Sequence, residues 1–143
     1  MDIKNLILIL LSSLIFSSQG YSEPFVAGLK AMDREHYATA FRAWKGLADS
    51  GEAEAQNNLG YLYQHGYGAK QSYTRAIHFY TMAAEQGLPE ASHNLGMLYF
   101  NGYGQPQNYD QAKRYFLKAA EKELGASESV SYTHLTLPTS DLV

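Results

Sequence analysis

The sequence contains no cysteine among its 143 residues. This excludes disulfide bonds, thiolate metal sites, thiol catalysis and a lipid-modified N-terminal cysteine. An excess of charge of one sign is also missing, because the net charge is only −3 and acidic and basic residues are interspersed. A basic stripe of the kind that neutralises phosphates is therefore absent. We expect no nucleic-acid partner, and a fold stabilised by packing alone.

Long hydrophobic runs are missing except near the N-terminus, at residues 6–16, where small and polar residues follow. The run is too short to span a bilayer, and its order is that of a secretory signal peptide. We expect residues 1–22 to be this signal, with cleavage after Gly20 or after Ser22. Ser22 is favoured because Glu23 then begins the first helix; an uncleaved membrane anchor is the alternative. The sequence thus predicts an exported protein, periplasmic or secreted, without a stable membrane anchor.

The dominant feature that is present is an internal repeat. Residues 53–86 and 89–122 are identical at 16 of 34 positions when they are compared at a shift of 36 residues. Within each copy, alanine, leucine and tyrosine recur at the spacing of helix faces, so each copy is predicted to be a pair of helices. The most informative matches join Asn58 with Asn94 and Gly60 with Gly96.

The expected helix ends carry chemical markers. Ser72 and Asn108 precede the second helix of each copy and are favoured N-cap residues. Pro89 stands at a helix start and Pro106 in a loop, so neither interrupts a helix. Glycine follows the last periodic residue of four expected helices, where a left-handed cap favours it. These glycines are Gly51, Gly66, Gly87 and Gly102.

Gly60 and Gly96 lie inside expected helices, where glycine costs about 1 kcal/mol relative to alanine. We expect the partner helix to approach closely there, with no side chain between the two helices. The segments around Gly66 and Gly102 read Gly-Tyr-Gly, but no lysine or further glycine completes a phosphate-binding loop. They are interpreted as tight turns between helices.

Residues 23–52 are interpreted as a divergent N-terminal helix pair. The first helix is expected to end near Asp33 and to carry Phe25 and Leu29 on its apolar face. The second, at about residues 37–48, matches the later copies at the shift of 36, with Trp44 at the position of Tyr80. Terminal repeats are expected to differ from internal ones because one of their sides faces water.

The repeated pattern A-E-A-Q-x-N-L-G-x-x-Y-x-x-G-x-G, followed by Y-x-x-A-x-x-x-Y/F-x-x-A-A-E, resembles the Sel-1-like repeat, a relative of the tetratricopeptide repeat. The resemblance covers residues 53–88 and 89–125. It implies an all-α fold, a right-handed superhelical solenoid of helix-turn-helix repeats. It also implies a scaffold that mediates protein–protein interaction, without catalysis and without a cofactor. We expect a monomer that binds a protein or peptide.

In related solenoids the first helix of each pair lines the concave face, which would bind the partner. Asn58 and Asn94 recur at equivalent positions, where they would either clasp a ligand backbone or hydrogen-bond to the neighbouring helix. Met97 and Phe100 are the better candidates for specificity. The partner-binding set implied by the resemblance is Asn57, Asn58, Tyr61, Gln64, His93, Asn94, Met97 and Phe100.

Residues that suit catalysis or metal binding are scattered. The histidines of the repeat region do not form an H-E-x-x-H pair, and no nucleophile elbow is recognisable. The alternative function is an enzyme or enzyme regulator that acts on cell-envelope polymers, peptidoglycan or polysaccharide. It would require paired carboxylates that converge on one groove, for which the first helices offer only Glu54 and Glu90.

Residues 126–143 depart from the repeat. A continued register would place alanine at position 127 and tyrosine at position 135, where the chain has Ser127 and Leu135. The run V-S-Y-T-H-L at residues 130–135 is what the codons GTC-TCT-TAT-ACA-CAT-CTG of a transposase sequencing adapter would encode. We interpret residues 126–143 as either a non-native translation of adapter sequence or a natural disordered tail.

Overall fold

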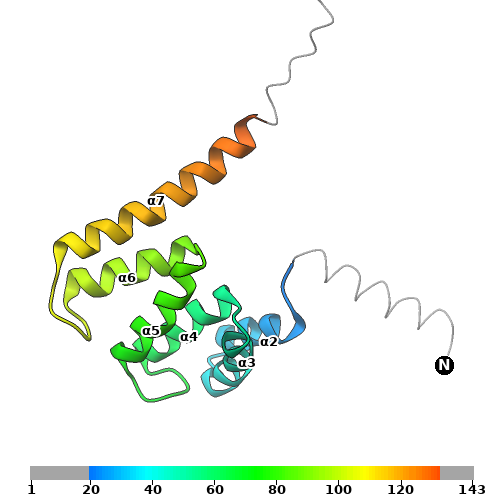
Figure 1. Ribbon diagram of the computed structural model, residues 1–143. Helices are drawn as coiled ribbons and strands as arrows, with labels where there is room; N and C mark the ends of the chain where they lie inside the picture. Colours follow the sequence, from blue (N-terminus) through cyan, green and yellow to red (C-terminus); the bar gives the residue numbers. More distant parts are fainter. Residues whose placement is uncertain (1–19, 133–143) are drawn as a thin grey trace, which may run out of the picture.

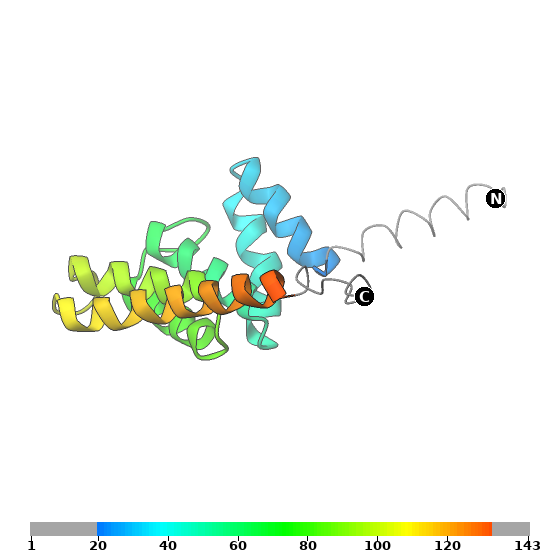
Figure 2. The ribbon, with the colours of Figure 1, turned by 90° about the horizontal axis from the view of Figure 1, so that it is seen from above.

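The computed structural model describes residues 20–132, and side chains up to residue 122. Within this part of the chain all regular structure is helical (Figure 1). The three helix pairs follow one another from the N-terminal end of the molecule to the other end (Figures 1 and 2). The helices are α2 (Glu23–Asp33), α3 (Tyr37–Asp49), α4 (Ala53–His65), α5 (Tyr73–Glu85), α6 (Pro89–Asn101) and α7 (Tyr109–Tyr132).

Each helix packs mainly against the next helix along the chain, from α2 through to α7. This succession of nearest-neighbour contacts is the organisation of a helical-repeat solenoid, as predicted. No helix in residues 20–132 combines the length and the hydrophobicity that a membrane crossing requires. Most of the expected signal peptide, and the last part of the expected tail, lie outside the described residues.

The predicted capping residues are confirmed at four helix ends. The Ser72 hydroxyl accepts a hydrogen bond from the backbone N–H of Arg75 at 3.3 Å. The Asn108 side-chain oxygen accepts one from the backbone N–H of Gln111 at 3.0 Å. Gly66 ends α4 at φ = 73° and Gly102 ends α6 at φ = 70°, in the left-handed region that glycine adopts most easily.

The C-terminal end of α7 differs from the prediction. The last repeat was expected to end at residue 125, but α7 continues to Tyr132, so residues 126–132 of the expected tail are helical. Residues 123–132 contain no proline, and the single glycine, Gly125, is tolerated inside a helix at a cost of about 1 kcal/mol. The loss of repeat register therefore did not mark a helix end.

Alanines bring the helices close together, and a buried aromatic ring at an equivalent position of each second helix packs between them. Ala40 and Ala76 are fully buried, and Ala112 is 1% exposed. The aromatic position is occupied by Trp44 in α3 and by Tyr80 in α5, which are 2% and 0% exposed. Small residues at the contact and a buried aromatic ring thus hold the helices together in a chain that has no disulfides.

Each of these rings lies across a glycine of the preceding helix. A Cβ atom on Gly60 would lie 2.8 Å from Tyr80 Cδ1, and one on Gly96 would lie 2.5 Å from Phe116 Cε1. The predicted close approach is therefore confirmed, but the expected absence of an intervening side chain is wrong. The helices are separated by one flat ring that only glycine leaves room for.

The N-terminal pair repeats this arrangement in a different register. A Cβ atom on Gly28 would overlap the indole of Trp44, so Gly28 takes the place of Gly60 at a shift of 32 residues. The connection between α2 and α3 contains only residues 34–36, whereas the later pairs are joined by residues 66–72 and 102–108. The shorter connection explains why the first helix of this pair does not align at the shift of 36.

The Gly-Tyr-Gly turns join consecutive repeats as well as the two helices of a pair. Tyr67 stacks on Tyr37 of the preceding pair with ring centroids 4.2 Å apart, and Tyr103 stacks on Tyr73 at 5.0 Å. A Cβ atom on Gly104 would lie 2.6 Å from Tyr73 Cβ. Each turn therefore packs onto the second helix of the repeat before it.

Candidate functional site

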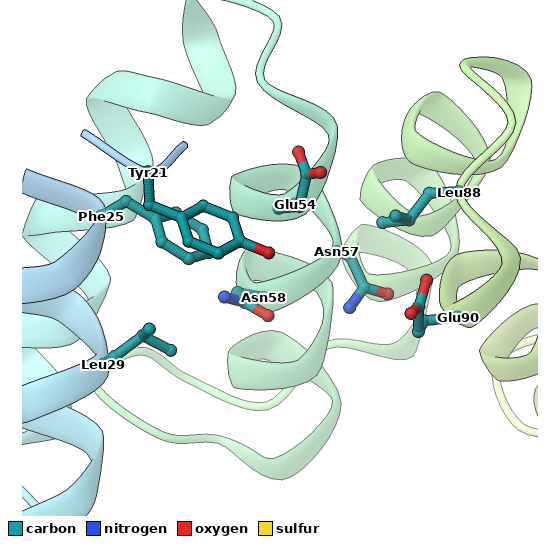
Figure 3. A pocket seen from close by; sticks show the side chains of 8 residues that line it. All are labelled: Tyr21, Phe25, Leu29, Glu54, Asn57, Asn58, Leu88 and Glu90. Carbon is teal, nitrogen blue, oxygen red and sulfur yellow. The ribbon is translucent and has the colours of Figure 1, made fainter. Parts of the chain in front are cut away.

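The first helices α2, α4 and α6 border a hollow of about 330 Å³, which we call the first-helix groove (Figure 3). Its lining combines an apolar wall with amide and carboxylate groups. The lining residues are Tyr21, Phe25, Leu29, Glu54, Asn57, Asn58, Leu88 and Glu90.

The apolar wall belongs mainly to α2. Tyr21 stacks on Phe25 with ring centroids 4.6 Å apart and an angle of 14° between the ring planes. The Trp44 indole N–H donates a hydrogen bond of 3.2 Å to the backbone oxygen of Phe25, which ties α2 to α3. Leu29 remains 44% exposed beside them. The wall is therefore a fixed apolar surface that is open to solvent on one side.

The two asparagines of α4 have different roles. Asn94 of α6 donates a side-chain hydrogen bond of 3.0 Å to the side-chain oxygen of Asn57. This contact matches one of the two predicted alternatives, a hydrogen bond between neighbouring first helices. The half-buried side-chain amide of Asn58 has no hydrogen-bond partner among the described residues, and it lies between Tyr21 and Leu29 (Figure 3). Asn58 is thus available to a ligand, whereas Asn57 is already engaged.

The charged groups of the groove are carboxylates. Glu54 of α4 and Glu90 of α6 both line it, and neither forms an ion pair with another described residue. Burial, together with the charge of Glu54, raises the pKa of the neighbouring Glu52 carboxyl group. Negative charge therefore accumulates at the starts of these helices. The groove favours a positively charged ligand group.

Gln64 and Tyr61 do not line the groove. The Gln64 side-chain oxygen accepts a 2.9 Å hydrogen bond from the Tyr80 hydroxyl. Burial raises the pKa of Tyr80 further above its ordinary value, in keeping with a buried hydroxyl that donates this bond. Gln64 is thereby tied to the core. Tyr61 is 39% exposed and packs its ring against His65 at 4.3 Å.

The remaining predicted residues lie toward the C-terminal end of the solenoid. His93 and Asn94 border a hollow of about 370 Å³ together with α7. Phe100 borders another, of about 470 Å³, also with α7, and Met97 is 42% exposed without lining either. Of the eight predicted residues, the structure thus brings only Asn57 and Asn58 into the groove.

The apolar wall was missed by sequence reasoning, although the chain carries a signal for it. At the shift of 32 residues that superposes Gly28 on Gly60, Phe25 falls on Asn57 and Leu29 falls on Tyr61. This register would have placed both residues on the same face as the predicted site. Among residues 20–122, whose side chains the structure describes, no cluster of three histidine, aspartate or glutamate side chains is arranged to hold a metal ion.

Comparison with known proteins identifies the repeat. The family model of the Sel1 repeat matches residues 53–88 and 89–124. The chain belongs to the Sel1 repeat family. Sel1 repeats form scaffolds that typically mediate interactions between proteins. The predicted family and the predicted all-α solenoid are therefore confirmed.

Two solved structures are similar over most of the described part. A Sel1 repeat protein from Oxalobacter formigenes has a TM-score of 0.66 and 31% identity, over 71% of this chain and 41% of its own. A protective antigen of uropathogenic Escherichia coli strains, with the SLR fold, has a TM-score of 0.66 and 33% identity, over 80% of this chain and 27% of its own. The match spans less than half the length of either relative. No curated protein matches the chain.

Proposed function

We propose that this Sel1 repeat protein is a monomeric scaffold that binds a segment of another protein in the first-helix groove, on the concave face, without catalysis of its own. The single observation that carries the proposal is the side-chain amide of Asn58. It lacks a hydrogen-bond partner among the described residues and lies beside an open apolar wall. A side-chain amide can donate a hydrogen bond to a backbone carbonyl of the bound segment and accept one from a backbone N–H, because it has both donors and an acceptor.

The lining defines the chemistry of the expected segment. An apolar or aromatic side chain would pack on Phe25 and Leu29, which form the wall. A lysine or arginine next to it would approach Glu54 and Glu90, which have no cationic partner among the described residues. The groove therefore favours an extended segment in which an apolar residue is flanked by basic ones.

Reversing the charge of the groove is expected to weaken this binding. A displayed library of random peptides is selected on the purified chain, and the affinity of the enriched peptide is measured by fluorescence anisotropy. The double variant Glu54→Lys/Glu90→Lys should lower the affinity at least about tenfold, which corresponds to about 1.4 kcal/mol. The affinity of the unaltered chain should also fall as salt is added, because salt screens exposed charges.

A matched control separates the groove from general charge effects. Glu85 and Glu121 are exposed and lie outside the groove, so the double variant Glu85→Lys/Glu121→Lys changes the net charge by the same amount and should leave the affinity within about twofold of the unaltered chain. Equal losses in the control and in the groove variant would show that only net charge matters. Unchanged affinity in the groove variant would contradict the proposal.

The second candidate, an enzyme acting on cell-envelope polymers, is favoured by one observation. Glu54 and Glu90 come from different helices and line the same hollow (Figure 3), as paired catalytic carboxylates do. The exposure of Glu90 argues against an enzyme. A carboxyl group that acts as a general acid usually has its pKa raised by burial. Purified peptidoglycan incubated with the chain should release no soluble fragments. Release that disappears in Glu54→Gln and Glu90→Gln would favour the enzyme over the scaffold.

We also propose that the protein is exported, with loss of its signal peptide. The apolar run at residues 6–16 and the small residues that follow support this. The contact of Tyr21 with Phe25 supports cleavage after Gly20, since cleavage after Ser22 would remove Tyr21 from the groove. Cleavage after Ser22 would also remove the oxygen that accepts the first hydrogen bond of α2, from Val26.

Intact-mass spectrometry of the protein from the cell envelope tests the export. We expect a chain that begins at Tyr21. A chain that begins at Glu23 would retain the export but remove Tyr21 from the groove wall. A cytoplasmic chain that begins at Met1 would contradict the export.

A further inference from the structure

Four aromatic rings form a column at the C-terminal end of α4. Tyr37 stacks on Tyr67 with ring centroids 4.2 Å apart. The His65 ring lies 5.5 Å from Tyr67 and 4.3 Å from Tyr61, measured between centroids. We call these four rings the aromatic column. Tyr61 is 39% exposed and His65 is also exposed, so this end of the column faces solvent.

Packing between repeats explains only the stacked tyrosine pair of the column. The pair recurs in the next repeat as Tyr73 and Tyr103, whose ring centroids are 5.0 Å apart. The two exposed members, Tyr61 and His65, do not recur, because methionine and asparagine stand at their positions in the next repeat. The exposed end of the column therefore needs an explanation other than the solenoid itself.

A carboxylate residue in a strained backbone conformation lies beside the column. Glu35 has a φ of 58° and is the only residue other than glycine with a positive φ among residues 20–132. It ends α2 with the same pair of backbone hydrogen bonds with which Gly51 and Gly87 end α3 and α5. A side chain in this conformation costs free energy that glycine avoids. Strain of this kind is concentrated at functional sites, so we looked for a role of the Glu35 side chain.

The charge of Glu35 acts on the column. Burial, and then the negative charge of Glu35, raises the pKa of the Tyr37 hydroxyl. No residue whose side chain is described forms an ion pair with Glu35. Helix α4 already holds one cation on an aromatic ring, since the guanidinium carbon of Arg75 lies 5.3 Å from the centroid of Tyr63. Exposed ring faces next to an unpaired carboxylate attract a further cation.

We propose that the aromatic column and Glu35 bind an arginine side chain of the segment that occupies the first-helix groove. The inference rests on the proposed function and adds a second anchoring point to it, because no residue of the column lines the groove. The guanidinium group would stack on Tyr61, and Glu35 would add charge attraction. Arginine suits the column better than lysine, since its flat group stacks on aromatic faces and is more weakly hydrated.

The place of the column on α4 sets the spacing of basic residues in the segment. Tyr61 follows Asn58, which lines the groove, by about one helical turn. Tyr61 lies about 10 Å along α4 from Glu54, a distance that an extended chain covers in about three residues. The segment should therefore carry an arginine about three residues from the basic residue that Glu54 attracts, with the apolar residue between them.

A neutral replacement in the peptide tests the stack. Selection of random peptides on the unaltered chain should enrich peptides with this spacing, and citrulline, the neutral isostere of arginine, then replaces the arginine. Measured by anisotropy, the affinity should fall about fivefold on the unaltered chain, as for a cation–π contact beside a charge. On Tyr61→Leu the same replacement should cost less than about twofold, because the ring is missing. On Tyr61→Phe, which keeps a ring, the fivefold loss should return.

Glu35 is tested through affinity and stability together. Glu35→Gly should weaken binding of the arginine peptide about threefold. It should also raise the thermal midpoint, followed by circular dichroism, by about 2–6 °C, because glycine adopts this conformation without strain. Glu35→Gln keeps the strain but not the charge, so it should weaken binding equally and leave the midpoint unchanged. Glu121→Gln removes an exposed charge outside both surfaces and should leave the affinity unchanged.

The outcomes separate this inference from the proposed function. An equal citrulline effect on Tyr61→Leu and the unaltered chain, full affinity of Glu35→Gly, or enriched peptides without arginine would overturn the inference alone. The groove would still be supported if Glu54→Lys/Glu90→Lys abolished the binding. Binding that depends on Tyr61 but survives Glu54→Lys/Glu90→Lys would support the column and contradict the groove. A selection that enriches no peptide would contradict both.

Discussion

Replacing Gly60 with leucine is expected to abolish the cooperative thermal unfolding of the chain. The first added atom, Cβ, would lie 2.8 Å from two atoms of the Tyr80 ring, which is closer than real side-chain contacts. Tyr80 is fully buried and is held by Gln64 through its hydroxyl, so the ring has no free space to enter. Overpacking by a few methylene groups already costs about 1–3 kcal/mol, and a leucine at this contact forces α4 and α5 apart.

The chain offers a matched control for this prediction. Gly46 lies inside α3, and a Cβ atom there would meet nothing within 4 Å. Gly46→Leu should therefore keep the fold and raise the free energy of unfolding by about 0.5–1 kcal/mol, since glycine is a poor helix former. Circular dichroism during heating measures both variants. A Gly60→Leu variant with an unchanged thermal midpoint would contradict the role assigned to this glycine.

Replacing Trp44 with alanine is expected to lower the free energy of unfolding by about 3–5 kcal/mol, the usual cost of removing a large buried aromatic side chain. Trp44 is 2% exposed, lies across Gly28 and donates a hydrogen bond to the Phe25 oxygen. Its removal would leave a cavity between α2 and α3 and would remove the hydrogen bond that ties the two helices together. Because small domains are stable by only about 5–15 kcal/mol, the N-terminal pair should unfold.

Trp44→Phe tests how much of this loss of stability depends on the size of the aromatic ring and how much on the presence of any ring. Phenylalanine occupies the equivalent position in the last pair, where Phe116 lies across Gly96, so this variant should lose less than half of the stability that Trp44→Ala loses. Urea unfolding followed by circular dichroism gives both values, since the variants lack the only tryptophan. Equal stability of Trp44→Ala and the unaltered chain would contradict the packing described for the first pair.

The architecture could be predicted because the repeat and its end markers are local signals. Ser72, Asn108 and the cap glycines each act within a few residues of their own helix, so their roles follow from the sequence alone. The ring across Gly60 could not be inferred in this way. It comes from Tyr80, on the next helix, and the choice between a bare helix contact and an intervening ring depends on tertiary packing.

The candidate site was predicted only in part for a similar reason. The side chains of Tyr61, Met97 and Phe100 are exposed, as their places on the first helices indicated. The sequence could not reveal that Gln64 accepts a hydrogen bond from Tyr80. The wall formed by Phe25 and Leu29 was hidden by the short connection that shifts its register to 32 residues. Side-chain partners and irregular loop lengths, rather than helix assignment, limited the prediction.

Site-specific photo-crosslinking in the producing cell tests the central claim, that the first-helix groove holds a partner protein, most directly. A photoreactive amino acid is placed at Leu29 in the groove and, as the control, at Arg42, which is exposed on α3 outside the groove. We predict that the Leu29 position gives one discrete protein adduct, that the Arg42 position gives none, and that Glu54→Lys/Glu90→Lys removes the adduct. The absence of an adduct at Leu29, or the same adduct from both positions, would contradict the claim.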